Sequence, residues 1–580
     1  MFKRKDIQET RLNFLMSAMH KGCCISTEDV LVWMRKQNEE VQTEINQIPI
    51  SELRGWKYRD DRIRHDSGRF FSIDGIHIQT NYRDVSTWDQ PIINQPEIGF
   101  LGFIVKKIQG VYHFLMQAKI EPGNLNVVQL SPTLQATRSN YTRVHKGAIP
   151  KYLEYFTGEK NVYVLVDQLQ SEQGARFLHK RNRNIIVEVE ESDPIEILDG
   201  FIWLSLGQIK ELISYPNVLN MDTRTVISCI TFGNYSEHSL KLMSLLLQKN
   251  QEISDDYLYS VLSEENHLHE LQDIIQWITT LKFKYELNVT PIGISQMDHW
   301  IYDGNSIFHE DHKYFDVVGV NVKIGNREVV SWDQPMVRSA QEGLMGFLVK
   351  KIDGIYHFLV QAKLESGNFD IVEMAPTVQC LTGNYRMGKN EYTIPYLEYF
   401  MNPKKENVWY SAYQSEEGGR FFQEQNLNII VEVGEEFPIE VDENYCWLTL
   451  NQMMSFVTYN NYLNIAARSY INMKRIGIIC PSEIAFRRFM PALQKCADLK
   501  YVGIACSSAE EWFGEALAET DPTSIAEVKE REWGKALNFQ TVYGGEIFDG
   551  YETLIKSNAI DAVYIPLPPA LHHKWAKLAS

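Results

Sequence analysis

An internal duplication is the feature that most constrains how this chain folds. Trp88-Asp89-Gln90-Pro91 recurs as Trp332-Asp333-Gln334-Pro335, at a spacing of 244 residues. The same spacing carries NIIVEV at 184–189 onto NIIVEV at 428–433. Solenoid repeats recur every ~20 to 50 residues, so a spacing this long indicates two copies of a whole domain.

The part of the sequence over which this spacing holds gives the predicted domain boundaries. Those units are an N-terminal helical segment (1–47), repeat one (48–230), a helical linker (231–290), repeat two (291–470) and a C-terminal unit (474–580). In the linker, Leu271, Ile274, Ile275, Ile278 and Leu281 fall on one helical face, which predicts a packed helix.

Each repeat is predicted to be α+β and richer in strand than in helix. Alternating β-branched and aromatic residues flank Gln109-Gly110 and Asp353-Gly354, which is typical of a strand pair joined by a turn. The capping boxes Ser205-x-x-Gln208 and Thr449-x-x-Gln452 predict where a strand passes into a helix.

Composition narrows the function classes. The net charge of −18 disfavours a non-specific nucleic-acid binder, and no window offers the ~18 apolar residues of a membrane span. The N-terminus has no signal-peptide core, and the eight cysteines contain no CxxC pair. We therefore expect a cytoplasmic protein with reduced thiols, no nucleic-acid partner and no membrane partner.

Beyond residue 470 the pattern changes. KRIGIIC, IAFRRFMPALQKC and KYVGIACSS follow one another as strand, helix and strand, and DAVYIPLPP has the composition of a later buried strand. Alternation of this kind predicts an α/β unit with a parallel, doubly wound sheet.

Several strings in the repeats resemble the NDP-hexose 2,3-dehydratase family. They are HDSGRFFSI (65–73), QAKIEPGN (117–124), LSPTLQATRSNYTRVH (130–145), QSEQGARF (170–177) and NRNIIVEV (182–189), echoed in repeat two by QAKLESGN, MAPTVQCLTGNY and QSEEGGRF. The resemblance spans about residues 48–470. It implies tandem Nudix-like domains, a homodimer and a sugar-nucleotide pocket associated with each copy.

The resemblance implies a lyase that acts on a dTDP-4-keto-6-deoxyhexose in deoxysugar biosynthesis. The C4 ketone acidifies the C3 hydrogen, so a base can form an enolate that expels the C2 hydroxyl. This step needs neither a metal nor a redox cofactor, and the chain has no Nudix box to hold Mg²⁺. The alternatives are a catalytically silent sugar-nucleotide-binding protein and a Nudix-type hydrolase.

Acid/base and substrate-binding candidates follow from residue type and position. The acid/base candidates are Glu121, Glu172, Tyr141, His145, Glu365 and Glu416. The substrate-binding candidates are Trp56, Thr137, Arg138, Ser139, Asn140, Tyr141, Arg143, Ser171, Gln173, Trp300, Asn384, Tyr385, Arg386, Ser415, Glu417 and Gly418. No metal site is predicted, at His572-His573 or elsewhere.

Each candidate has a structural alternative. Trp56 and Trp300 can stack on a base or belong to a core. The cationic loop 137–146 suits a diphosphate but also a solvated turn, and the Ser-Glu-x-Gly strings at 171–174 and 415–418 also suit simple turn chemistry. Recurring histidines such as His65 and His309 are more often hydrogen-bonding core residues.

The C-terminal unit resembles the nucleotide-binding half of the Gfo/Idh/MocA oxidoreductases. The carrying strings are RIGIICPSEIAFRRFMPALQK and DAVYIPLPPALHHKWA. The resemblance implies a partial Rossmann-like domain that would take NADPH or NADP if complete, although Cys480-Pro481-Ser482 stands where a glycine-rich turn is expected and no Glu-Lys-Pro motif follows. It also implies that a 3-ketoreductase acts next.

Overall fold

The structure is a computed structural model that describes most of the chain up to residue 470 and parts of the remainder. The described residues are 3–20, 24–137, 149–236, 239–240, 255–263, 265, 267–325, 329–381, 393–470, 476–479, 501–508, 511, 529, 533, 536–537, 540, 545–557, 560 and 563–564. Several sheets and few helices confirm the α+β class. No helix in these ranges has both the length and the apolar character needed to cross a membrane.

Repeat one is built on an 8-stranded sheet. Its strands are β1 (Lys3–Arg4), β11 (Tyr163–Ser171), β12 (Arg181–Glu188), β7 (Gly99–Ile108), β8 (Val111–Ile120) and β13 (Phe201–Ser205), with β10 (Leu134–Ala136) beside β7 and β9 (Val128–Ser131) beside β8. The helices of this half are α1 (Ile7–Ala18), α2 (Thr27–Glu40), α4 (Glu154–Thr157), α5 (Leu206–Leu212) and α6 (Met221–Ser228). Within repeat one, α6 packs against β7, β9 and β12.

Repeat two follows the same plan on a 7-stranded sheet. Its strands are β21 (Glu373–Ala375), β20 (Ile355–Lys363), β19 (Gly343–Ile352), β24 (Gln425–Glu432) and β23 (Val408–Ser415), with β22 (Val378–Cys380) beside β19 and β25 (Tyr445–Thr449) beside β20. Its helices are α8 (Asp255–Leu262), α9 (Leu271–Lys284), α10 (Glu398–Met401), α11 (Leu450–Val457) and α12 (Ile465–Arg468). The duplication seen in the sequence is thus a duplication of structure.

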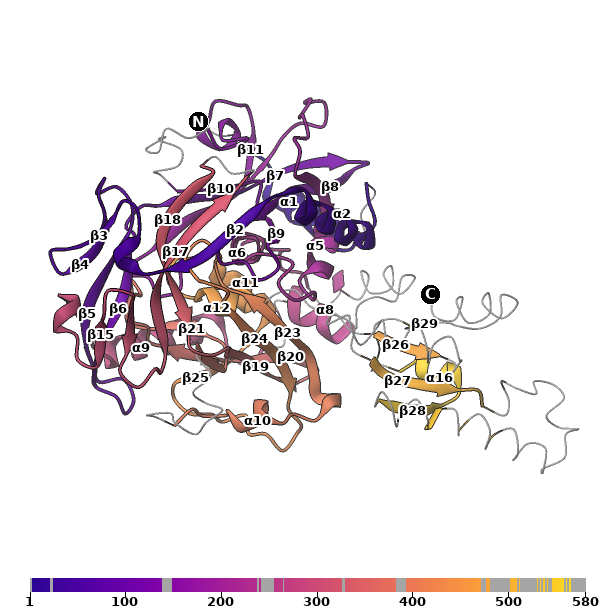
Figure 1. Cartoon of the computed structure of the whole chain (residues 1–580). Coiled ribbons are helices and arrows are strands. Elements are labelled where there is room, and N and C mark those ends of the chain that lie inside the picture. Colours follow the sequence, from indigo (N-terminus) through magenta and orange to yellow (C-terminus); the bar gives the residue numbers. More distant parts are fainter. Residues whose placement is uncertain are drawn as a thin grey trace, which may run out of the picture.

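Each repeat adds a smaller 5-stranded sheet, and these two sheets exchange one strand. The first holds β3 (Trp56–Arg59), β4 (Arg62–His65), β5 (Ser72–Thr80), β6 (Thr87–Asn94) and β14 (Leu287–Ile292); the second holds β2 (Thr43–Ile48), β15 (Trp300–Tyr302), β16 (Ser306–His309), β17 (Phe315–Ile324) and β18 (Ser331–Ser339). The short turns η1 (Ile50–Glu52) and η2 (Ile294–Gln296) follow the exchanged strands, and η4 (Lys405–Asn407) precedes β23. Figure 1 shows β2 lying along β17 of the other repeat.

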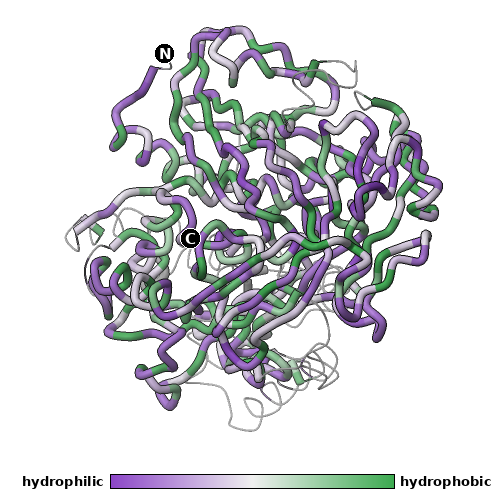
Figure 2. The backbone as a smooth tube through the Cα atoms, turned by 90° about the vertical axis from the view of Figure 1, so that its left-hand side faces the viewer, coloured by the Kyte–Doolittle hydropathy of each residue, from purple (hydrophilic) through white to green (hydrophobic). Residues whose placement is uncertain are grey.

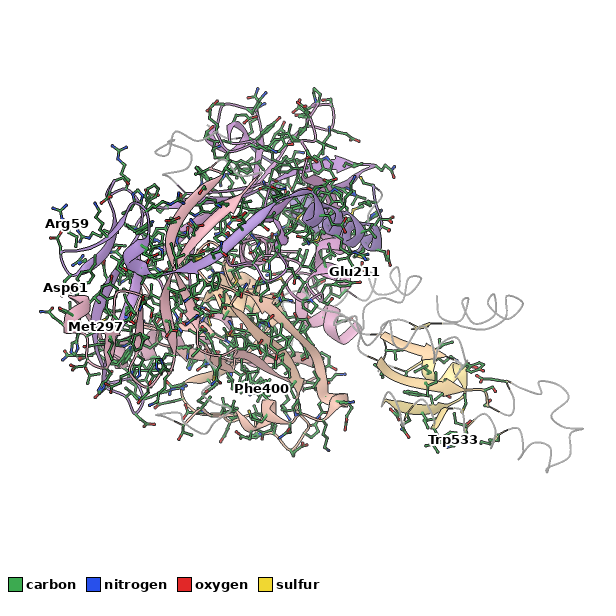
Figure 3. All side chains as sticks on the ribbon, in the orientation of Figure 1. Arg59, Asp61, Glu211, Met297, Phe400 and Trp533 are labelled. Atoms are coloured by element: carbon green, nitrogen blue, oxygen red, sulfur yellow. The ribbon has the colours of Figure 1, made fainter. Side chains whose placement is uncertain are left out.

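The exchange ties the repeats into one hydrophobic core. β14, which precedes repeat two, pairs with β5 of repeat one, and Asp61 accepts hydrogen bonds from Ser295 N (3.0 Å) and Oγ (2.7 Å). Figure 3 labels Asp61 beside Met297, at the same edge of the molecule. One buried cluster contains Phe103 and Phe347 from the two large sheets. Green and purple stretches alternate along the tube in Figure 2, as expected for strands with one buried face.

The local predictions are confirmed. Gln109 (φ 53°) and Gly110 (φ 81°) adopt the left-handed conformation that a tight hairpin turn requires, as do Asp353 and Gly354. Both capping boxes are formed, and α9 buries Ile274, Ile278 and Leu281. Only Leu271 of the predicted apolar face is exposed, because it begins the helix.

The C-terminal unit contains a 4-stranded parallel sheet of order β28-β27-β26-β29, at the right of Figure 1. Its described elements are β26 (Ile476–Ile479), β27 (Tyr501–Cys506), β28 (Glu546–Asp549), β29 (Val563–Tyr564) and α16 (Tyr551–Ile555). The predicted parallel pairing is confirmed. The turn at Cys480-Pro481-Ser482 and the His572-His573 pair lie outside the described residues.

Candidate active site

The first candidate site is a cavity of about 500 Å³, here called cavity one, to which both repeats contribute. Repeat one supplies Trp56, His65, Lys119, Glu121, Gln135, Glu172, Lys180, Asn182 and Asp222, and repeat two supplies Trp332, Asp333, Gln334, Glu417, Gly419 and Arg420. Because buried carboxyl groups and cations face one another there, cavity one has the composition needed for proton transfer next to an anionic ligand.

Glu121 follows the end of β8 and is held in a fixed position. Gln135 donates from Nε2 to Glu121 Oε1 (3.0 Å), and Lys119 Nζ lies 3.8 Å from the same oxygen. The other oxygen, Oε2, is buried and has no hydrogen-bond partner among the described residues. Glu121 therefore has one anchored oxygen and one that is available to a proton on a bound molecule.

Glu172 follows the end of β11 and is fully buried. Asn182 donates from Nδ2 to Glu172 Oε1 (2.6 Å). Burial raises the pKa of Glu172, while the positive charges of Lys180 and Arg468 oppose that rise. Lys180 also donates to the backbone oxygen of Glu97, which fixes its ammonium group near Glu172.

Asp222 and Glu417 complete the group of acids in cavity one. Burial raises the pKa of Asp222 well above its usual value, and the charges of Glu417, Glu172 and Glu121 raise it further. Asp222 lies in the first turn of α6, where the helix favours a negative charge by about 0.3–1 kcal/mol, less than the ~1.4 kcal/mol of one pKa unit. Burial and the neighbouring carboxyl groups, which raise the pKa of Asp222, therefore outweigh the helix, which would lower it.

Glu417 comes from repeat two. Burial raises the pKa of Glu417 to about 7, with Arg420 opposing the rise and Glu121 and Glu172 adding to it. Arg420 is partly buried and lies over the ring of Phe71 in repeat one, with Cζ 4.2 Å from the ring centroid. The loop that carries Glu417 and Arg420 thus forms part of a wall built mainly by the other repeat.

The second candidate site, cavity two, has a volume of about 600 Å³ and repeats this plan with the roles exchanged. Repeat two supplies Trp300, His309, Lys363, Glu365, Gln379 and Cys380, and repeat one supplies Arg83, Trp88, Asp89, Gln90 and Arg176. Gln379 donates from Nε2 to Glu365 Oε1 (2.8 Å), and Glu365 Oε2 is again buried without a partner among the described residues. Burial raises the pKa of Glu365.

The cavities differ at positions that carry charge. At the 244-residue spacing, Ala466 stands where repeat one has Asp222, and Glu424 stands where it has Lys180. Burial raises the pKa of Glu424 to about 7, and the positive charge of Arg176 opposes this rise. The duplicated frame is therefore preserved while the set of ionisable groups is not.

Trp56 and Trp300 line the two cavities, as the substrate-binding prediction requires. Trp56 donates from Nε1 to the backbone oxygen of Asp333 (2.7 Å), and Trp300 donates to that of Asp89 (2.7 Å). The ring of Trp56 packs on Phe71 with centroids 4.7 Å apart. Both indoles thus close the junction between the repeats and form part of a cavity wall.

Five of the other predicted residues lie in the linings of the two cavities. Glu121, Glu172, Thr137 and Glu417 line cavity one, and Glu365 lines cavity two. The remaining described candidates, Ser171, Gln173, Ser415, Glu416 and Gly418, are buried beside the linings at the junction between the repeats.

Two of these junction residues, Ser171 and Ser415, form hydrogen bonds across the repeats behind the cavity linings. Ser171 donates from Oγ to Glu373 Oε2 (3.0 Å), and Ser415 donates to Gln129 Oε1 (3.1 Å), in each case across the two repeats. Asn426 donates to Glu416 Oε1 (2.6 Å), and burial raises the pKa of Glu416 to about 8.

The predicted cationic loop lies outside the described residues, apart from Thr137. The residues concerned are Arg138, Ser139, Asn140, Tyr141, Arg143 and His145, with Asn384, Tyr385 and Arg386 in repeat two. His65 lines cavity one, where burial lowers its pKa, and His309 lines cavity two.

Sequence reasoning missed Asp222, Lys180, Lys119, Gln135 and Arg420. The signal that finds the first two is the comparison of the repeats with each other. Asp222 and Lys180 are charged lining residues of repeat one whose counterparts, Ala466 and Glu424, differ in chemical type, as Asp298 does from Arg54. Among the described residues, no group of three or more His, Cys, Asp or Glu has the arrangement of a metal site.

Comparison with known proteins agrees with this duplicated site. A family model described as NDP-hexose 2,3-dehydratase matches residues 27–230 and 271–473, and both matches include the helix before the exchanged strand, α2 or α9. The chain therefore belongs to the NDP-hexose 2,3-dehydratase family, and it is an enzyme of the dehydratase class.

Individual relatives cover the same region. The chain is 42% identical over 449 residues to a dTDP-4-dehydro-6-deoxy-α-D-glucopyranose 2,3-dehydratase of Saccharopolyspora spinosa, covering 77% of this chain and 91% of that protein. It is 38% identical over 467 residues to the same-named protein of Amycolatopsis orientalis, covering 79% and 92%.

A different relative covers a much shorter stretch. The chain is 36% identical over 104 residues to a dTDP-3,4-didehydro-2,6-dideoxy-α-D-glucose 3-reductase of Actinomadura kijaniata, covering 18% of this chain and 24% of that protein.

Proposed function

We propose that this enzyme removes water from C2 and C3 of a dTDP-4-dehydro-6-deoxyhexose, and that cavity one is where it does so. The observation that carries the choice of cavity is the set of acids and cations there, which includes Asp222 and Lys180. At the matching positions repeat two has Ala466 and Glu424, and neither is among the residues that line cavity two. The sugar chemistry follows from the relatives of similar length that are named for that substrate.

Glu121 is the group that we propose as the base in cavity one. Its Oε2 is buried and lacks a hydrogen-bond partner among the described residues, while Oε1 is held by Gln135 and Lys119. A base whose position is fixed can remove the C3 proton, which the adjacent C4 ketone acidifies. The enolate then expels the C2 oxygen, and the enol that forms tautomerises to a 3,4-diketo-2,6-dideoxy sugar.

Positive charge in cavity one supports binding of an anionic sugar nucleotide. Lys119 and Lys180 are buried in its wall and Arg420 is partly buried there, although the chain as a whole carries a net charge of −18. Fixed cations in a site from which water is excluded stabilise both a diphosphate and a developing enolate. The loop residues Arg138 and Arg143 remain predicted diphosphate ligands.

The C4 ketone stores the electrons released from C3, so we propose that dehydration requires no metal and no redox cofactor. The enzyme is incubated with dTDP-4-dehydro-6-deoxyglucose in EDTA, and NADPH with a known 3-ketoreductase traps the product for mass spectrometry. We expect loss of one water and a trapped 2-deoxy sugar. Unchanged substrate with the wild-type enzyme would contradict the proposed function, and a strict need for added Mg²⁺ would contradict the metal-free step.

Matched substitutions test the choice of cavity. Glu121→Gln and Glu365→Gln make the same change in cavity one and cavity two, next to Gln135 and Gln379 respectively. We expect Glu121→Gln to lower kcat by about 10²–10⁴-fold, the usual contribution of a general base, and to affect turnover far more than Glu365→Gln does. The reverse order would move the reaction to cavity two.

For the C-terminal unit, we propose a partial nucleotide-binding domain of the Gfo/Idh/MocA type. The parallel order β28-β27-β26-β29 is that of one half of a doubly wound sheet, and the local relatives are named 3-reductases of the diketo sugar. Reduction at C3 is the reaction that would consume the dehydratase product. Titration of the chain with NADPH, followed by fluorescence, should show saturable binding, and its absence would contradict the nucleotide-binding proposal.

Three further proposals concern fold and assembly. The repeats are proposed to be Nudix-like, the enzyme to be a homodimer and its location to be the cytoplasm. Light scattering after size-exclusion chromatography should give twice the 67.3 kDa of one chain, and a mass of one chain would contradict the dimer.

A further inference from the structure

Asp222 is the carboxyl group of repeat one that distinguishes cavity one from cavity two, and Glu417 of repeat two, whose counterpart is Gln173, is a second difference. Other acids lining or adjoining the cavities recur at the 244-residue spacing, as Glu121 does in Glu365 and Glu172 in Glu416. At the position of Asp222, repeat two has Ala466. A function confined to cavity one must use a group that cavity two lacks.

The frame around Asp222 is the same in both repeats. In repeat one, Asn220 caps α6 by accepting from Thr223 N (2.8 Å), and it donates from Nδ2 to Gln135 Oε1 (3.0 Å). Gln135 in turn donates to Glu121. This chain of hydrogen bonds fixes the first turn of α6, and with it Asp222, relative to the carboxylate of Glu121.

Repeat two preserves every link of that chain. Asn464 accepts from Ala467 N (2.9 Å) and donates to Gln379 Oε1 (2.7 Å), and Gln379 donates to Glu365 (2.8 Å). Only the carboxyl group is missing, because Ala466 stands in the place of Asp222. The frame therefore folds without an acid at this place, so Asp222 is not required to hold α6 against the strand ends.

The surroundings of Asp222 suit a proton donor. Its side chain is almost completely buried, and the neighbouring charges are mostly carboxylates. Lys180 stabilises the negative charge of Glu172, and that charge in turn raises the pKa of Asp222. Repeat one thus combines Lys180 and Asp222, which repeat two lacks at the matching positions, and the acids around Asp222 favour its protonated form.

We propose that Asp222 is the general acid that protonates the departing C2 hydroxyl in cavity one, while Glu121 removes the proton from C3. This proposal rests on the proposed function, since it assigns a role within that reaction. The C3–H bond breaks toward Glu121 Oε2 and its electron pair enters the C4 carbonyl as an enolate. The electrons return to form C2=C3 as the C2–O bond breaks, and the proton of Asp222 converts the leaving oxygen to water.

The proton balance then closes without a further reactant. The C2=C3 enol transfers its O3 proton to C2 through solvent and becomes the C3 ketone. Glu121 has gained one proton and Asp222 has lost one, so exchange with solvent restores both groups. The net change is substrate to diketo product plus one water.

Separating the two proton transfers tests the proposal. With Asp222→Asn in D₂O, we expect exchange of the C3 hydrogen to stay within a few-fold of wild type, because enolate formation precedes loss of the hydroxyl. Dehydration should fall by about 10²–10⁴-fold, the usual contribution of a general acid. Glu121→Gln should lose both exchange and dehydration.

A second substrate bypasses the acid. Fluoride leaves without being protonated, so the 2-deoxy-2-fluoro analogue of the substrate should release fluoride from Asp222→Asn at close to the wild-type rate. Asp222→Ala reproduces the residue that repeat two accommodates at Ala466, so it supplies a second variant if the amide variant fails to fold. Asp199→Asn, at an exposed aspartate outside both cavity linings, controls for the chemical change itself.

The outcomes separate the two proposals. Wild-type turnover by Asp222→Asn and Asp222→Ala would overturn the role of Asp222 while leaving the dehydratase function intact. Loss of exchange, fluoride release and dehydration together would show that Asp222 acts in removal of the C3 proton or in folding. That result would also overturn its role as the general acid. A wild-type enzyme that forms no diketo product would overturn the proposed function itself.

Discussion

The junction between the repeats should depend on glycines with no space for a side chain. Gly123 donates from its backbone N to Gly418 O (2.8 Å), and its own oxygen accepts from Gln423 N (3.0 Å). A Cβ atom at Gly123 would stand 1.6 Å from the backbone oxygen of Phe421. Because that oxygen belongs to the backbone, an alanine here must push the two repeats apart.

The expected loss of stability for Gly123→Ala follows from these contacts. Two hydrogen bonds are worth about 1 kcal/mol each, and overpacking costs about 1–3 kcal/mol. The reduced freedom of alanine in the unfolded chain returns about 0.4–1 kcal/mol. The net loss is about 2–4 kcal/mol, measured as a lower urea midpoint for the main unfolding transition.

Activity should fall with stability, because the displaced segment leads directly into cavity one. Gly418 precedes Gly419 and Arg420, which line that cavity. A displacement of about 1 Å in a positioning residue can reduce the rate by about 10²-fold. Gly68→Ala is the matched control: Gly68 is in a left-handed turn (φ 64°) with open space around it, so only a conformational cost of about 1 kcal/mol is expected.

The result that would refute this reasoning is a Gly123→Ala enzyme as stable and as active as the Gly68→Ala control. The two repeats would then be able to separate slightly without consequence, and the sharing of cavity walls would have no energetic basis.

Three further predictions concern buried charge. Burial raises the pKa of Glu417 to about 7 from an ordinary 4.5, so ionised Glu417 costs the fold nothing below pH 4.5 and about 3 kcal/mol above pH 7. Glu417→Gln should therefore reduce the loss of stability between pH 4.5 and pH 8, measured by urea unfolding. The same loss in the variant and the wild type would argue against this cost. Arg468→Met should cost about 3–5 kcal/mol in the same assay, because the buried guanidinium donates to Leu463 O and Ser171 O (both 2.6 Å), and a cost below 1 kcal/mol would contradict this. Arg54→Ala should cost only about 1 kcal/mol by thermal unfolding, because the Arg54 side chain is 63% exposed, even though it pairs with buried Asp333 at 2.7 Å. A loss above about 3 kcal/mol would show that exposure does not weaken this ion pair.

The sequence predicted the elements of each repeat well because their signals are local. A tight turn such as Gln109-Gly110 needs residues that accept positive φ, and a capping box such as Ser205 with Gln208 needs two residues three apart. Both patterns can be recognised without knowing what the segment packs against. The spacing of 244 residues then extends each local prediction to the second copy.

The exchange of β2 and β14 between the repeats was not predictable in the same way. Each strand precedes the repeat to which it belongs in sequence but pairs with the sheet of the other. Strand partners depend on long-range packing, and neither TEINQI nor LNVTPI carries a mark of its partner. For the same reason, Glu417 was predicted to bind substrate but could not be assigned to a cavity built mainly by repeat one.

The site predictions included the carboxyl groups at strand ends that line the cavities, and they missed the acid on a helix. Glu121 and Glu172 stand next to turn residues, which made them visible as candidates. Asp222 follows Asn220 in a segment that looks like an ordinary helix start, where an acidic residue needs no functional explanation. Its significance arises only from burial beside three other acids, which is a property of the folded protein.

Because the repeats share cavity walls, repeat two contributes residues to a cavity that is lined mainly by repeat one. Cavity one takes Trp332, Asp333 and Glu417 from repeat two, and Asp333 is itself anchored by Arg54 N (2.7 Å) of repeat one. An alanine at position 466 leaves the lining of cavity one unchanged, whereas loss of the loop around Glu417 would open that cavity. On the proposed assignment of the reaction to cavity one, the residues of repeat two that face cavity one are constrained by that reaction, while those that face cavity two are not.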